Sequence, residues 1–96
     1  MQGGLIVHTL VNEVVDGKIR DITLTVKKSE SEILSSRLKI SEDCTEATLV
    51  KVDVFTDNET IVHDSFLMII DEMREKGIEI IEFQNSQKQG FSSLNL

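Results

Sequence analysis

The run His63-Asp64-Ser65 contains the three side-chain types of a hydrolase triad in consecutive positions. A triad requires its three groups to converge in space, whereas neighbouring residues on a helix point in different directions. Asp64 or Ser65 is better suited to cap a helix, because a short side chain with an oxygen atom accepts a hydrogen bond from a free backbone N–H. The run therefore predicts a helix start and not a catalytic centre.

Cys44 is the single cysteine, and it lies in the polar stretch Ser41–Glu46. A nucleophilic thiolate needs a neighbouring histidine or cation, but the charged neighbours here are the carboxylates Glu42 and Asp43. We expect an unreactive thiol. One cysteine forms no intramolecular disulfide, which is typical of proteins from a reducing compartment.

Four acidic residues crowd one stretch of the chain, namely Asp53, Asp57, Glu59 and Asp64. Clusters of oxygen ligands bind Ca²⁺ or Mg²⁺, but this stretch lacks the alternating ligands and the glycine of an EF-hand loop. We favour loop solvation and a favourable interaction with the helix dipole. One cysteine with two distant histidines is not a zinc ligand set. We predict no catalytic, cofactor-binding or metal-binding residue.

Charge argues against two classes of partner. The formal net charge is −7, and residues 57–84 hold eight acids against Arg74 and Lys76. Nucleic acids and anionic membranes need clustered bases, so we predict no nucleic acid and no membrane partner. The bases Lys27, Lys28, Arg37 and Lys39 form a small positive group, which we assign to a sheet edge, where charge blocks aggregation. Gly3-Gly4 precedes a strand and is therefore no phosphate loop.

Asp16-Gly17 between two β-rich runs predicts a type I′ hairpin that joins strands 5–15 and 18–28. If Val15 faces Lys18, the numbers of paired residues sum to 33, so that Glu13 faces Arg20. One face then carries the apolar residues Val7, Val11, Ile22, Leu24 and Val26. The other face should be largely in contact with water and carries His8, Asn12, Asp21, Thr23 and Thr25.

The following segment has two interpretations. Ser29-x-x-Glu32 matches a capping box and would start a short helix, whereas the alternation from Leu34 to Ile40 is typical of a half-buried strand. We favour a strand over 33–40. Clean alternation then predicts a strand over 47–56.

A helix over 60–76 follows, starting between Glu59 and Ser65, and Gly77 ends it as a left-handed residue. Its apolar stripe consists of Val62, Phe66, Ile69, Ile70 and Met73. A strand over 78–84 completes the pattern, and the run from 47 to 83 is compatible with a crossover between two parallel strands. Residues 85–96 are expected to form a flexible tail.

These elements predict a single α+β domain over 1–84. It has a mostly antiparallel sheet of about five strands (5–15, 18–28, 33–40, 47–56 and 78–84) and one main helix on one face. No stretch approaches the ~20 apolar residues of a membrane span, and the N-terminus lacks the basic region of a signal peptide. We expect a cytoplasmic protein.

Three functions remain open. The first is a small non-catalytic intracellular protein-interaction or regulatory domain that pairs with a protein partner or with itself, as a homodimer through strand 5–12. The second is a small-molecule-binding or accessory enzyme domain, with a pocket between helix 60–76 and the sheet. The third is an acidic decoy that inhibits a nucleic-acid-binding protein.

Overall fold

Asp16 and Gly17 form the turn that the sequence predicts between the first two strands, β1 (Leu5–Val15) and β2 (Lys18–Lys28). Both turn residues have positive φ, 53° and 77°, as a type I′ turn requires. The predicted register is confirmed at most positions, including Val7 opposite Val26 and Val11 opposite Ile22. This hairpin is the first unit of the computed structural model, which describes residues 4–84 and 91–95.

β3 (Ser31–Ile40) continues the antiparallel pairing, so the strand interpretation of this segment is confirmed and the helical one is wrong. Ser29 caps no helix, because it takes a φ of 57° in the tight turn between Lys28 and Ser31. β4 (Glu46–Val54) then pairs antiparallel with β3.

The helix α1 spans Glu59–Glu75, close to the predicted range. Its cap is Asn58, whose side-chain oxygen accepts a hydrogen bond from the Ile61 N–H at 3.2 Å. The predicted cap at Asp64 or Ser65 is wrong, because the extended Asn58 starts the helix more than a turn earlier. Gly77 follows the helix with a φ of 90°, as predicted.

After α1, β5 (Ile80–Gln84) runs parallel to β4, with Ile81 opposite Ala47, so the 47–83 segment is a crossover between parallel strands. β6 (Phe91–Asn95) pairs antiparallel with β5 and is the last strand in the order β1-β2-β3-β4-β5-β6. The flexible tail predicted over 85–96 is therefore wrong for 91–95, while 85–90 and 96 lie outside the described residues. The α+β fold class is confirmed.

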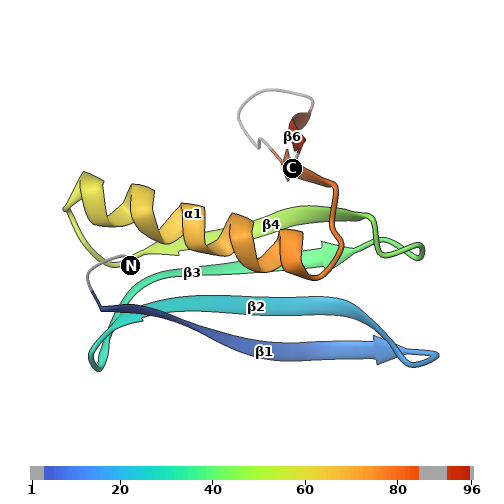
Figure 1. Ribbon diagram of the computed structural model, residues 1–96, viewed down its shortest axis with the longest axis horizontal. Coiled ribbons are helices and arrows are strands. Elements are labelled where there is room, and N and C mark those ends of the chain that lie inside the picture. The colour runs from blue at the N-terminus through green and yellow to red at the C-terminus, as the bar shows by residue number, and fades with distance from the viewer. Residues whose placement is uncertain (1–3, 85–90, 96) are drawn as a thin grey trace.

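The core lies between α1 and one face of the sheet (Figure 1). Ile69 and Met73 from α1 are buried, while Val62, Phe66 and Ile70 are partly buried against the same core. The strands contribute Ile22, Leu24, Val26, Ile33, Leu34, Leu38, Ile40, Ala47, Leu49 and Ile81. Among the described residues, no helix covers the opposite face of the sheet. Side chains on that face can therefore form a site that is accessible from solvent.

Candidate functional site

His63, Asp64 and Ser65, the run in which we predict no catalytic triad, lie in α1. The His63 side chain is 73% exposed, and its Nδ1 lies 3.9 Å from an Asp64 oxygen. Ser65 points the other way, into the core, where its hydroxyl oxygen has no hydrogen-bond partner among the described residues. The helix therefore separates the hydroxyl from the imidazole, and the three groups do not converge.

Cys44 lies in the loop between β3 and β4, with a φ of 62°. Its thiol donates to the Glu42 carbonyl at a sulfur–oxygen distance of 3.9 Å, and the side chain packs against the edge of the core. In the described part of the chain, no three side chains of His, Cys, Asp or Glu gather closely enough to hold a metal ion. The acidic stretch that begins at Asp53 thus forms no such ligand group.

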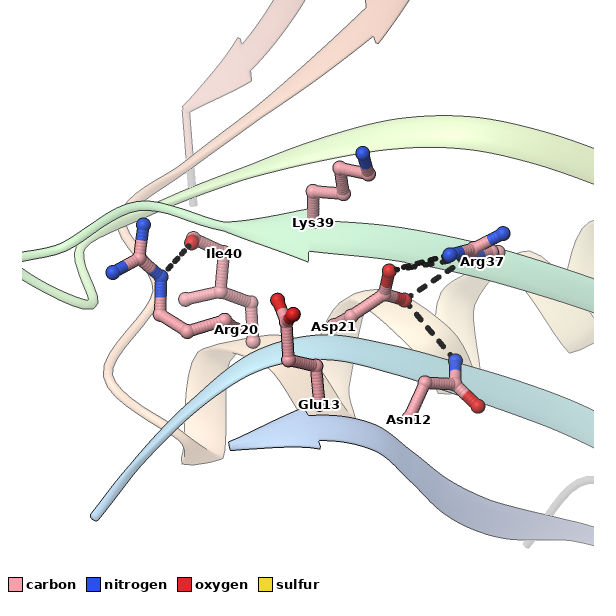
Figure 2. A pocket seen from close by; sticks show the side chains of 7 residues that line it. All are labelled: Asn12, Glu13, Arg20, Asp21, Arg37, Lys39 and Ile40. Atoms are coloured by element: carbon pink, nitrogen blue, oxygen red, sulfur yellow. Dashed lines mark hydrogen bonds and ion pairs between the residues drawn. The ribbon is translucent and has the colours of Figure 1, made fainter. Parts of the chain in front are cut away.

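The most connected polar group is a carboxylate on the uncovered face of the sheet. Asp21 in β2 accepts hydrogen bonds from Arg37 in β3, with Nη2–Oδ2 at 2.7 Å and Nε–Oδ1 at 3.0 Å (Figure 2). Asn12 in β1 donates to the same carboxylate at 3.1 Å and to the Thr23 hydroxyl at 2.7 Å. One side chain therefore ties three strands together.

The prediction that Asp21 contacts water is wrong, because only 6% of its side chain is exposed. The hydrogen bonds from Arg37 lower the pKa of Asp21 the most, burial opposes them by raising it, and Asn12 adds to the lowering. The carboxylate correspondingly raises the pKa of Arg37. Asp21 is ionised at neutral pH with its oxygens occupied, so it supplies neither a general acid nor a free base.

Beside this pair is a polar hollow of about 440 Å³, lined also by Glu13, Arg20 and Lys39 (Figure 2). The Arg20 Nε donates to the Ile40 carbonyl at 3.1 Å. The predicted pairing of Glu13 with Arg20 is wrong, because a local irregularity in the pairing of β1 with β2 places Glu13 opposite Asp21. Arg20 binds the backbone of β3 instead.

The assignment of the basic residues to a sheet edge is also wrong. Arg37 and Lys39 lie in β3, and Lys27 and Lys28 lie in β2, and both strands have neighbours on each side. Arg37 donates hydrogen bonds to the Asp21 carboxylate and does not protect a sheet edge. Its role could be recognised from the sequence only by knowing that β3 pairs with β2 in a register that sets Arg37 beside Asp21.

A second hollow is apolar and lies between the end of β4 and the first turns of α1. It has a volume of about 500 Å³, and Val54, Val62 and Phe66 form its walls. Thr56, Asp57, Glu59 and His63 complete the lining. The sequence analysis raises a pocket between helix 60–76 and the sheet but does not identify the residues that line this cleft.

The third feature is the outer edge of β1, which has no strand partner among the described residues (Figure 1). Several apolar side chains of β1 are exposed, Leu10 by 62% and Ile6 by 56%. Val11, Val14 and Val15 are exposed in the same strand. Since β6 lies at the other side of the sheet, residues 91–95 do not cover this edge.

Comparison with known proteins finds no family model that matches the chain and no curated protein that matches it in sequence. None of the described helical segments is long and apolar enough to cross a membrane.

Proposed function

We propose that this protein is a small, non-catalytic protein-interaction domain that forms a homodimer through β1. The observation that carries the proposal is a strand edge that has no partner in the described part of the chain and has exposed apolar side chains along it. Proteins usually protect such edges with charge, proline or a covering segment. From Leu5 to Asn12 the edge has no proline and no formal charge when His8 is neutral, so pairing with a second copy protects it.

The pairing that fits best is antiparallel, about a two-fold axis that passes beside His8. Ile6 and Leu10 both lie on the face of β1 away from α1, two positions to either side of His8. An axis at His8 sets Ile6 of one copy opposite Leu10 of the other, so that the two apolar side chains contact each other across the strands. The two sheets then continue into one another over residues 5–11 of each copy.

A non-catalytic role in the cytoplasm is part of this proposal. The buried carboxylate of Asp21 is engaged by Arg37 and Asn12 and is not available to a substrate. The single cysteine, Cys44, fits a protein that needs no intramolecular disulfide. Neither feature favours an enzyme, and the apolar surfaces favour binding.

Light scattering after size-exclusion chromatography tests the homodimer. At micromolar concentration we expect twice the chain mass of 10.8 kDa. Leu10→Lys should raise the dimer dissociation constant by about tenfold, because the two-fold axis makes the Ile6–Leu10 contact twice and lysine replaces an apolar side chain in both. Leu67→Lys, at an exposed apolar position on α1, is the matched control and should leave the dimer intact. A wild-type mass of 10.8 kDa would rule out the homodimer.

Cross-linking tests the register separately. In a Cys44→Ser background, His8→Cys should form a disulfide-linked dimer on mild oxidation, because the axis brings the two positions 8 together. Leu67→Cys should not. A dimer that cross-links through neither β1 position 8 nor its neighbours would refute pairing through this strand.

A further inference from the structure

We propose that the cleft between β4 and α1 binds an extended basic segment of another protein, which adds a strand to the free part of β4. This site is distinct from the β1 edge and does not depend on the homodimer. The proposal rests on three properties of the cleft: a stretch of backbone with no strand partner on one side among the described residues, an apolar wall and an acidic rim.

The backbone property comes from the unequal lengths of the neighbours of β4. β3 pairs with β4 as far as Val54, opposite Leu34, whereas β5 pairs with β4 only from Glu46 to Leu49. Residues 51–54 thus have no strand on their outer side in the described part of the chain. An extended peptide can form hydrogen bonds with the unpaired N–H and C=O groups of a strand, so the ligand we expect is an extended segment.

The apolar wall lies directly beside this backbone. Val54 from β4 and Val62 and Phe66 from α1 line the cleft, and its volume of about 500 Å³ is within the range of ligand-binding pockets. Val52 and Phe55 are also exposed at this end of β4. Alternate side chains of an added strand point to the same face, so every second residue of the ligand would enter the cleft. The ligand should therefore carry apolar residues at alternate positions.

The acidic rim sets the charge of the ligand. Asp57 and Glu59 line the cleft, and among the described residues no lysine or arginine lines it. Lys51, the nearest base along β4, lies 3.6 Å from the carboxylate of Asp53. Opposite charges across an interface guide association and exclude partners of the wrong sign. The ligand should carry lysine or arginine beside its apolar residues.

The same rim makes a second copy of this chain a poor occupant. β1, the exposed strand that a second copy would offer, contains Glu13 and no lysine or arginine from Leu5 to Val15. Each copy also has a net charge of −7. The cleft is therefore assigned to a basic partner and β1 to self-association.

Two synthetic peptides test the proposal by NMR titration of the ¹⁵N-labelled protein. Both alternate threonine and valine, but one is flanked by lysines and the other by glutamates. We expect the lysine-flanked peptide to bind about tenfold more tightly or better, with amide shifts concentrated at 51–54 and 59–66. Equal affinities, no binding of the lysine-flanked peptide, or shifts confined to β1 would each overturn the proposal.

Paired variants locate the two contributions. Val54→Asp should weaken binding of the lysine-flanked peptide about tenfold, because it places a carboxylate in the apolar wall, while Leu67→Asp should not. Glu59→Gln should weaken it severalfold, while Glu75→Gln at the other end of α1 should not. Circular dichroism and thermal unfolding verify that each variant is folded. Loss of binding in the control variants as well would overturn the assignment to this cleft. So would broadening of the amide signals of 51–54 that increases with protein concentration in the absence of peptide, because it would show that a second copy of the chain occupies the cleft.

Discussion

At the scale of single residues, Asp21 shows how a neighbour changes the role of a side chain. Its position in β2 places it on the face without a helix, where a carboxylate is normally solvated. Arg37 and Asn12 instead enclose it and replace water with charge-assisted hydrogen bonds. The resulting contact joins β1, β2 and β3 on the face that α1 does not cover.

The lowered pKa of Asp21 predicts a pH dependence of stability. A carboxyl group whose pKa is lower in the folded than in the unfolded state stabilises the fold above the unfolded value, about 3.9. Asp21→Asn should therefore be less stable than the wild type at pH 7, by a margin that persists to about pH 4. Below that, as the folded carboxyl takes up its proton, the margin should shrink.

Urea unfolding of both proteins at neutral and acidic pH measures this margin. The pKa of Asp43 is also lowered, by hydrogen bonds from Ser41 and Thr45, but Asp43 is present in both proteins and cancels in the difference. A margin that grows on acidification would show that the ion pair does not favour the folded state.

At the scale of elements, short polar residues decide where each strand and helix begins and ends. Asn58 is an effective helix cap because its backbone is extended just before Glu59, and the helix continues through the His63-Asp64-Ser65 run without interruption. Ser29 acts likewise as a turn residue, although its spacing to Glu32 also fits a capping box. For Ser29, the pairing of β2 with β3 decides between the turn and the helix start.

The hairpin turn yields a prediction about backbone strain. Gly17 has a φ of 77° and open space where a β-carbon would be, so a substitution there meets no clash and changes only backbone energy. Gly17→Val should lower the free energy of unfolding by about 1–2 kcal/mol, because a β-branched residue resists positive φ. Gly17→Asn should cost much less, since asparagine tolerates this region.

Denaturant unfolding of the two variants tests the turn. Equal stability of Gly17→Val and wild type would contradict the type I′ conformation. A large loss in Gly17→Asn as well would point to a contact of Gly17 rather than to its backbone.

At the scale of the whole molecule, exposed apolar side chains lie in two places on a protein with a net negative charge. β1 exposes apolar groups at one border of the sheet, and the β4–α1 cleft exposes others beside an acidic rim. The two proposed contacts should respond to salt in opposite directions. Two copies that each carry −7 repel, whereas an acidic cleft attracts a basic segment.

Salt titration turns this difference into a prediction. Raising ionic strength from about 0.01 M to about 0.15 M shortens the Debye length from about 30 Å to about 8 Å. The homodimer should therefore become severalfold tighter, as measured by sedimentation equilibrium. The lysine-flanked peptide should bind more weakly over the same range. A dimer weakened by salt would indicate attraction between charges of the two copies, contrary to pairing through the uncharged part of β1.

The sequence by itself determined the elements whose causes are local. The Asp16-Gly17 turn imposes the hairpin and its register, alternation marks β3 and β4, and helical spacing marks α1. Each depends on residues a few positions apart, so neighbouring residues contain the information.

Only the tertiary structure decided which of these surfaces are buried. The irregular pairing at Glu13, the enclosure of Asp21 by Arg37 and the strand formed by residues 91–95 depend on how neighbouring strands pair, which no local pattern in the sequence marks. The exposure of Val54 follows from the pairing of β5 with β4, which stops at Leu49, and that of Leu10 from its place on the sheet face away from α1. Hydrophobicity predicts that a side chain favours burial, but the covering element decides whether it is buried or left to bind a partner.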